Sequence, residues 1–328
     1  MRKKFLFLVL LLALCIFSGI LFGSISLSPV DVLRCLAGQD RDTTTYVLIH
    51  TVRLPRVAGA CLAGMGLATA GVILQGVMNN SLASPNTIGV NSGAGFAVML
   101  TLMLGGSYTY HVPAAAFLGA LVTTLAIYGL AFLSDSSRTT IILAGITVSS
   151  FLNAGINTIK LLDSDISVNL TSFLIGSLSG LTFDSLRIPG GAILAAMFTS
   201  FLLSKAVNVL SLGDDIARSL GLNVSVMRLI LLVLSSVLAG CVVSYAGLLS
   251  FVGLIVPHIC RRLFGNDARS LLPCSALLGA CFVLICDTLG RVLFSPFELP
   301  AGIIMSFVGG PFFLYLLLKK KGGRRVNA

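Results

Sequence analysis

Residues 53–95 read RLPRVAGACLAGMGLATAGVILQGVMNNSLASPNTIGVNSGAG. The stretch opens with two arginines around Leu-Pro and continues as a long apolar segment rich in glycine and alanine. A polar turn of Gln, Asn, Ser and Pro then interrupts the apolar sequence before it resumes. A soluble protein has little use for this layout, whereas a membrane protein that moves a polar solute needs both parts. The stretch therefore predicts a membrane-embedded helix that ends in a polar turn.

The composition of the whole chain also indicates a membrane protein. The chain has 328 residues, of which 56% are hydrophobic and only 10% are charged. Its mean hydropathy is +1.01. A soluble domain carries about 25% charged residues, so this chain has too few charges to cover a surface in water. The 34 glycines suit helices that pack closely in lipid, and the GxxxG spacings Gly89/Gly93 and Gly176/Gly180 fit that use.

The net charge of +10 does not indicate a nucleic-acid partner. The basic residues cluster at the ends of apolar segments, which is the pattern that membrane topology produces. The eight cysteines form no CxxC pair and have no zinc-like spacing with histidine, and most lie inside apolar runs. We therefore expect no metal site, no disulfide framework and no cofactor bound by this chain.

Apolar windows predict an all-α integral membrane protein with about ten transmembrane helices and short cytoplasmic helices. The windows lie near residues 5–25, 57–77, 88–105, 113–133, 139–159, 188–207, 227–247, 250–264, 271–294 and 300–318. The eighth is too short to cross a hydrocarbon core of about 30 Å unaided. No segment is typical of a separate soluble domain, so residues 1–328 are expected to form one transmembrane domain.

The first window and the distribution of Lys and Arg set the predicted orientation. The window follows a basic start, MRKK, as in a signal peptide, but its length of about 20 residues favours a retained span. Ten spans place both termini on one side of the membrane. Placing that side in the cytoplasm puts most basic residues inside, including the clusters at both chain ends. Both termini are therefore predicted to be cytoplasmic.

No sequence motif assigns catalytic residues to this chain. Walker A, GxSxG and HExxH sequences are all absent. Asp287 is the one good candidate for an intramembrane acid, and Arg291 four residues later predicts a local ion pair. Because ion-coupled carriers use intramembrane acids, the energy source is expected on a partner protein. An ion-coupled secondary transporter and a membrane scaffold without transport remain alternatives of other classes.

The inner segment NVLSLGDDIARSLGLNVSVMR, residues 208–228, predicts a short amphipathic helix. Gly213 precedes two acids, which are favourable at a helix N-terminus, and Gly221 closes the helix. The apolar side chains of Ile216, Leu220 and Leu222 either face a partner protein or lie on the membrane surface.

Five ordered motifs resemble those of the FecCD family, the permease subunits of ATP-binding-cassette importers for ferric siderophores, haem and vitamin B12. They are RLPR (53–56), the Gly-rich span with its NNSLASP turn, SLGDDIARSLGLNV (211–224), FVGLIVPHICRRLFGNDARSLLP (251–273) and DTLGRVLFSPFELPAGIIMSFVGGPFFLYLL (287–317). The resemblance covers almost the whole chain. Two departures concern the NPLA motif, which is Asn80-Ser81-Leu82-Ala83 here, and a common Trp, which is Phe173 here.

The resemblance implies a fold similar to the vitamin B12 importer permease, in a bacterial cytoplasmic membrane. It implies three protein partners: an ATPase dimer that binds ATP and Mg, an extracytoplasmic substrate-binding protein, and a second permease copy. That second copy is either identical or paralogous. The expected cargo is an iron–siderophore-type chelate, with haem or cobalamin as the alternative.

The resemblance also implies roles for particular residues at the outer face and the ATPase contact. Arg53, Arg56 and Arg291 would receive acidic residues of the binding protein, since arginine pairs with carboxylates in a fixed geometry. Their alternative role is to anchor helix ends at the lipid headgroups. The residues expected at the ATPase contact are Leu212, Gly213, Asp214, Ala217, Arg218, Leu220 and Gly221.

A third implied site is a polar gate on the translocation path. Its expected residues are Gln75, Asn79, Asn80 and Asn86, which lie near the inner end of the second span. Irregular backbone at membrane depth is tolerated where it lines a cavity. The alternative is that the asparagines only cap helices or form turns.

Overall fold

The computed structural model describes residues 2–25, 27–39, 43–107, 111–133, 138–163 and 170–322, so the last basic residues of the chain lie outside it. All regular structure among these residues is helical. The elements are α1 Arg2–Leu21, α2 Pro29–Leu36, α3 Thr44–Val47, the π-helical η1 Leu48–Arg53, α4 Leu54–Val77, the 3-10 helix η2 Pro85–Ile88, α5 Val90–Met103, α6 His111–Leu133, α7 Arg138–Leu162, α9 Thr171–Ile175, α10 Phe183–Leu202, α11 Ser204–Ser211, α12 Asp214–Ser219, α13 Val224–Ala246, α14 Val252–Phe264, α15 Ala268–Val292 and α16 Ala301–Gly322.

Each predicted apolar window coincides with a helix. Seven apolar helical segments among the described residues are long enough to cross a membrane, namely Lys3–Leu21, Thr44–Val77, His111–Leu133, Arg138–Leu162, Phe183–Leu202, Val224–Ala246 and Ala268–Val292. The other three windows hold α5, α14 and α16, of which the described apolar parts are shorter. The all-α membrane fold is therefore confirmed. One boundary was wrong, because the second span continues outward to Thr44 through α3 and η1.

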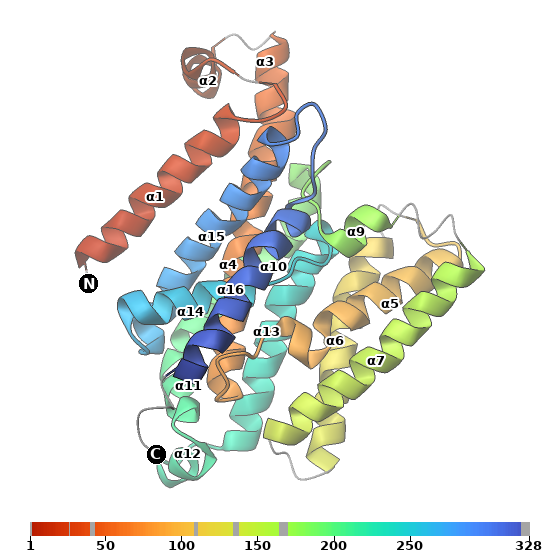
Figure 1. Cartoon of the computed structure of the whole chain (residues 1–328), viewed down its shortest axis with the longest axis vertical. Coiled ribbons are helices and arrows are strands. Elements are labelled where there is room, and N and C mark those ends of the chain that lie inside the picture. Colours follow the sequence, from red (N-terminus) through yellow and green to blue (C-terminus); the bar gives the residue numbers. More distant parts are fainter. Residues whose placement is uncertain are drawn as a thin grey trace.

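Helix α4, which contains the Gly-rich sequence, lies in the middle of the bundle (Figure 1). It packs against α15, α13, α14 and α10. Most of its residues are buried, including apolar ones on every side of the helix. Helices α2 and α3 lie at one end of the molecule, and α12 lies at the opposite end (Figure 1). The two ends of the bundle therefore present different segments to the two sides of a membrane.

The glycines of α4 bring neighbouring backbones into contact, as predicted. A Cβ atom on Gly64 would lie 2.1 Å from the carbonyl oxygen of Gly279 in α15, and one on Gly71 would lie 2.0 Å from that of Gly253 in α14. Gly93 makes a similar contact with α6. The Gly176/Gly180 spacing serves another purpose, because both residues have positive φ in a loop after α9 and not in a helix.

Gly64→Ala is expected to lower the free energy of unfolding by about 1–3 kcal/mol, because the added methyl group meets rigid backbone. The matched control is Gly191→Ala in α10, where nothing lies within 4 Å of the added Cβ. That variant is expected to stay within about 1 kcal/mol of the wild type. Thermal unfolding of the detergent-purified proteins compares the two, and equal midpoints for both variants would contradict close α4–α15 packing.

Candidate functional site

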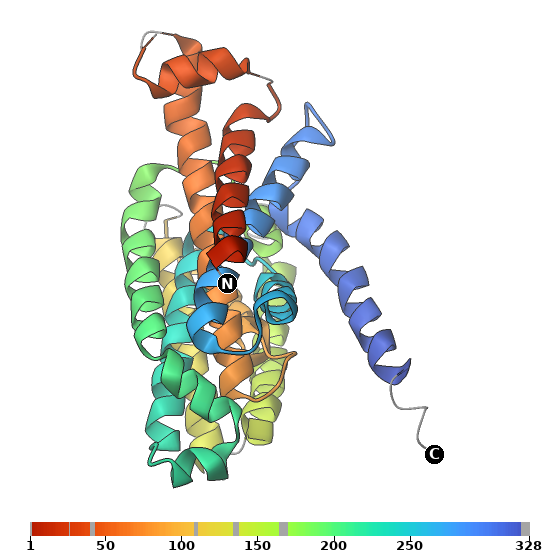
Figure 2. The ribbon, with the colours of Figure 1, turned by 90° about the vertical axis from the view of Figure 1, so that its left-hand side faces the viewer.

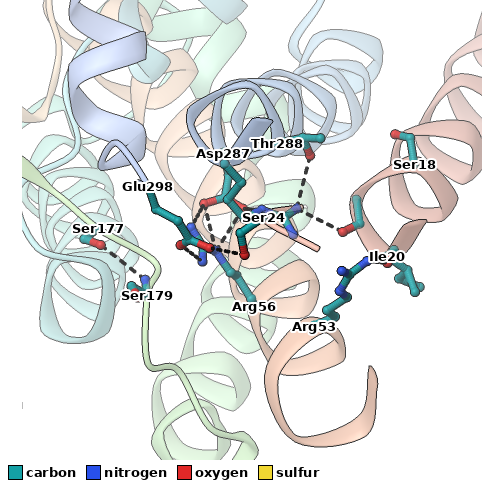
Figure 3. Close-up of polar contacts among 12 residues, drawn as sticks. Ser18, Ile20, Ser24, Arg53, Arg56, Ser177, Ser179, Asp287, Thr288 and Glu298 are labelled. Atoms are coloured by element: carbon teal, nitrogen blue, oxygen red, sulfur yellow. Dashed lines mark hydrogen bonds and ion pairs between the residues drawn. The ribbon is translucent and has the colours of Figure 1, made fainter. Parts of the chain in front are cut away.

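Three arginines meet at the end of the bundle near α2 and α3. Arg53 ends η1, Arg56 lies in the first turn of α4, and Arg291 lies in the last turn of α15. All three are buried. Together with Asp287 and Glu298 they form what we call the arginine cluster (Figure 3). The structure therefore brings together the three arginines that the motif resemblance assigned to one site.

Asp287 is shared by two arginines. Its carboxylate accepts from Arg56 Nε at 3.0 and 3.1 Å, and it lies 3.1 Å from Arg291 Nε. The local Asp287–Arg291 ion pair predicted from the sequence is thus confirmed. Arg56 Nη1 also lies 2.6 Å from a carboxylate oxygen of Glu298 (Figure 3). Asp287 is fully buried, whereas the Glu298 side chain is 32% exposed, so Glu298 forms the open side of the cluster.

The arginines also hold the end of α1. Arg53 donates to the carbonyl oxygens of Ile20, Leu21 and Ile25, with 2.7 Å to Leu21. Arg291 Nη2 donates to Gly19 O at 2.9 Å. The last turn of a helix leaves carbonyl groups without intrahelical partners, and cationic side chains satisfy them well. The cluster therefore joins α1, α4 and α15.

The sequence-based expectation of an outer-face site for these arginines did not include their burial. Asp287, Glu298 and the carbonyls of α1 turn the three guanidinium groups inward. The cluster contains three cations and two carboxylates, which leaves a formal charge of +1. In a docking role, this excess positive charge would attract one carboxylate of the binding protein. That role stays a prediction.

A second charge cluster lies at the α12 end of the bundle. Asp214, the first residue of α12, accepts from Arg138 Nη2 at 2.5 Å and from Arg228 Nη2 at 2.6 Å. Arg138 begins α7, and Arg228 lies in the first turns of α13. Partial burial acts against the charged carboxylate, but the hydrogen bonds and charges of the two arginines outweigh it and lower the pKa of Asp214. We call these residues the Asp214 cluster.

Helix α12 carries the residues predicted at the ATPase contact. Gly213 and Gly221 flank it with φ of +117° and +80°, values that favour glycine. Leu212, Ile216 and Leu220 are exposed apolar side chains, whereas Ala217 is buried against the bundle. Arg218 is exposed and lies 3.7 Å from Asp215. The helix thus presents an apolar surface at the end of the molecule while Asp214 ties it to α7 and α13.

The four residues of the predicted gate lie in different surroundings. Gln75 is buried and donates to Gly253 O at 3.1 Å, while its own carbonyl oxygen accepts from Arg261. Asn80 Oδ1 accepts from Leu82 N at 2.9 Å, which is the turn-forming role of the alternative. Asn86 is exposed. Gln75 therefore fastens α4 to α14 instead of pointing into an open path in this structure.

Asn79 links the polar turn to the Asp214 cluster. It has a positive φ of 45°. With its amide turned so that Oδ1 faces Arg138 Nη1 at 3.2 Å, Nδ2 donates to Ser211 O at 3.3 Å. The turn after α4 is therefore in direct contact with the residues that hold α12. Sequence reasoning missed Arg138 and Arg228, and their position at the starts of inner helices was the only available signal.

Metal-binding chemistry has no visible basis among the described residues. Within them, no three His, Cys, Asp or Glu side chains gather closely enough to hold an ion. The cysteines are free, and all but one are buried in the apolar core.

Comparison with known proteins matches the chain over nearly its full length. The profile of the FecCD transport family matches residues 10–319. The chain is 38% identical to the Fe(3+)-citrate import system permease protein of Bacillus subtilis, covering 94% of this chain and 92% of that protein. It is 38% identical to the achromobactin transport system permease protein of Dickeya dadantii, with 96% and 91% covered.

A haem-related relative and a solved structure extend this similarity. The hemin transport system permease protein of Yersinia pestis is 34% identical, with 97% of this chain and 95% of that protein covered. A structure described as an inward-facing metal-chelate type ABC transporter superposes with a TM-score of 0.87 at 31% identity. The match covers 97% of this chain and 100% of the solved chain. The similarity therefore extends over nearly the whole chain.

Proposed function

The chain belongs to the FecCD transport family, and we propose that it is the permease subunit of an importer for an iron–siderophore-type chelate. It works as one multi-pass domain of the bacterial cytoplasmic membrane, with both termini in the cytoplasm. The observation that carries the proposal is the pair of charge clusters: the arginine cluster lies toward the end of the bundle with α2 and α3, and the Asp214 cluster lies at the end with α12. Figure 1 shows these helices at opposite ends of the bundle. The substrate-binding protein contacts the end with the arginine cluster, and the ATPase contacts the end with the Asp214 cluster.

The ATPase partner contacts the α12 end. The chain has no nucleotide-binding motif, so ATP and Mg are bound by the partner. Exposed Leu212, Ile216 and Leu220 offer the apolar surface, with Arg218 beside them. Asp214 connects this surface to α7 and α13 through two short ion pairs. A displacement of α12 by the ATPase is therefore carried directly into membrane helices.

A second permease copy covers α16, either as a homodimer or with a paralogue. Helix α16 leaves the rest of the bundle at an angle and packs mainly on α15 and α14 (Figure 2). Its side chains Phe307, Leu314 and Tyr315 are exposed. Large apolar side chains on a helix that stands away from its own bundle suit contact with another membrane protein.

The cargo proposal rests on the named transport systems of the relatives. One is an Fe(3+)-citrate system, one an achromobactin system and one a hemin system. Two of these three names denote systems other than haem, which favours a small iron chelate here. Import of haem or cobalamin by the same machine is the second candidate.

Transport in proteoliposomes tests the proposed function. The permease is reconstituted with its cognate ATPase and binding protein, and uptake of radioactive ferric chelate is followed with and without ATP. We expect uptake only when all three proteins and ATP are present. Uptake by the permease alone, driven by a proton or sodium gradient, would overturn the proposal in favour of a secondary transporter.

Docking of the binding protein is expected to respond in opposite directions to two substitutions in the arginine cluster. Glu298→Gln raises the formal charge of the cluster from +1 to +2 and should tighten docking by up to about fivefold. Arg53→Gln lowers it to zero and should weaken docking by a similar factor. Affinity is measured at low and high salt, since these differences should shrink as salt screens the charges.

The control for docking is Arg187→Gln, which removes an exposed charge from α10 outside the cluster. Its affinity should match the wild type. Damage to the fold can weaken docking but cannot tighten it, so tighter binding by Glu298→Gln would support the assignment. Weaker binding by Glu298→Gln protein that stays folded at the assay temperature would refute it.

A further inference from the structure

An apolar groove lies where the start of α1 faces the end of α14 and the start of α15. Its volume is about 670 Å³, within the range of about 300–1,000 Å³ that small-ligand sites occupy. The residues that line it are Lys3, Phe5, Leu6, Val9, Phe264, Arg269, Ser270, Pro273 and Cys274. None of them belongs to the arginine cluster or to the Asp214 cluster.

The groove exists because α1 packs along only part of its length. The buried residues Leu8, Leu12, Cys15 and Gly19 recur at helical spacing and face the bundle. Toward its N-terminus α1 leans away from α15 (Figure 1). Lys4 Nζ donates to Leu263 O at 2.8 Å, and this bond holds the start of α1 to the end of α14. The walls of the groove are therefore fixed on both sides.

Basic side chains occupy one edge of this groove. Lys3 and Arg269, which we call the basic rim, are exposed, and Lys4 follows Lys3 in the sequence. The nearby acid is Asp267, whose carboxylate accepts from Asn208 Nδ2 at 2.7 Å and from Arg269 N at 3.0 Å. Three cations, namely Lys3, Lys4 and Arg269, and one carboxylate leave a formal charge of +2 at this corner.

We propose that the groove binds one anionic phospholipid. Its phosphate lies at the basic rim, and one acyl chain lies along Phe5, Leu6 and Val9. The proposal rests on the proposed function in one respect, namely that the chain sits in a bacterial membrane with its N-terminus at the cytoplasmic surface.

The charge and position of the groove select this ligand over others. Apolar walls beside a cationic edge match the two chemically distinct parts of a phospholipid, and basic pockets between membrane helices bind anionic headgroups in this way. Phe5, Leu6 and Val9 are exposed on a helix long and apolar enough to span the membrane, so hydrocarbon already surrounds this face. The excess positive charge favours an anionic over a zwitterionic headgroup.

Native mass spectrometry of the detergent-purified permease tests the proposal. The protein is titrated with dioleoylphosphatidylglycerol or dioleoylphosphatidylcholine, which share acyl chains and differ in charge. We expect one tightly bound phosphatidylglycerol and clearly weaker phosphatidylcholine. The double variant Lys3→Gln/Arg269→Gln should lose about fivefold in affinity per charge removed, and only for the anionic lipid. Val9→Trp, which fills the groove, should weaken both lipids.

The charge-matched control is Arg34→Gln/Arg187→Gln, which removes two exposed cations and should keep the lipid preference. Arg34 lies in α2, which follows the end of α1 opposite to the groove. Equal loss in this control would show that net charge alone attracts the lipid and would overturn the site. Competition by soluble glycerol phosphate would show a free anion site instead. Binding is measured without transport, so these outcomes are independent of the proteoliposome experiment on function.

Discussion

Asp287→Ala is expected to lower the free energy of unfolding of the permease by about 3–5 kcal/mol, because it leaves two buried guanidinium groups without their shared carboxylate. Arg56 and Arg291 both lie within 3.1 Å of Asp287, and all three side chains are buried. Removing one member of a buried ion network costs far more than the network contributes as a whole, since the remaining charges stay desolvated.

The structure supplies two graded comparisons for Asp287. Glu298→Gln changes a carboxylate that is 32% exposed and bound to Arg56, so water can partly replace it and the loss should be about 1 kcal/mol. Asp184→Ala removes the acid of an exposed pair with Arg187, at 3.1 Å, and should change stability by less than that. The expected order of destabilisation is therefore Asp287, then Glu298, then Asp184.

Thermal unfolding of the purified variants in one detergent measures this order. If Asp287→Ala does not accumulate as folded protein, Asp287→Asn provides a milder test, because the amide keeps the shape and one acceptor oxygen. A midpoint for Asp287→Asn equal to that of Asp184→Ala would show that the buried carboxylate is not needed to hold the arginines.

The helices of this fold were predictable because each depends on a continuous local stretch of apolar residues. All ten windows contain a helix, and the short eighth window is the 13-residue α14. The second window started too late because the π-helical turn Leu48–Arg53 carries His50 and Arg53, which resemble the end of a span. The structure shows that the helix continues through this turn to Thr44.

The polar contacts were much harder to predict, because they join residues far apart in the chain. Arg56 and Asp287 are 231 residues apart, whereas the Asp287–Arg291 pair follows from helical spacing alone. The expectation of a shared outer-face site for Arg53, Arg56 and Arg291 contained no statement about their burial. The carbonyls and acids that bury them come from α1, α15 and the segment before α16, which only the folded chain brings together.

The Asp214 cluster shows the same limit at the other end. The acids after Gly213 were correctly expected at a helix N-terminus, but the partners of Asp214 were not predicted. Arg138 lies 76 residues before it in the chain. Arg228 lies 14 residues after it and in another helix, so the i+3 or i+4 spacing within one helix does not predict this pair. Only the folded bundle brings the starts of α7, α12 and α13 together.

Asp214→Ala is expected to reduce ATP-driven uptake in proteoliposomes by at least about tenfold, while the ATPase still hydrolyses ATP. The substitution removes both ion pairs that tie α12 to α7 and α13. Two charged hydrogen bonds of this kind contribute about 1.5–3 kcal/mol each, so their joint loss frees the helix that receives the ATPase movement. Uptake per ATP hydrolysed is the quantity that reports this loss of coupling.

The lowered pKa of Asp214 adds a pH dependence to this prediction. Because the folded state lowers this pKa, the stabilisation is complete above the ordinary carboxyl value of about 3.9 and disappears as pH falls through the folded value. Coupling should therefore be insensitive to Asp214 titration at neutral pH. The decrease in the free energy of unfolding below about pH 4 should be smaller in Asp214→Ala than in the wild type, because the variant lacks this carboxylate.

Asp215→Ala is the matched control for coupling, because Asp215 is the neighbouring acid on the same short helix. Its side chain is 100% exposed and lies 3.7 Å from Arg218, a weak surface pair. The control should keep wild-type uptake per ATP, since it leaves both ion pairs of Asp214 in place. Equal coupling in the two variants would mean that α12 transmits the ATPase movement through its apolar contacts and not through Asp214.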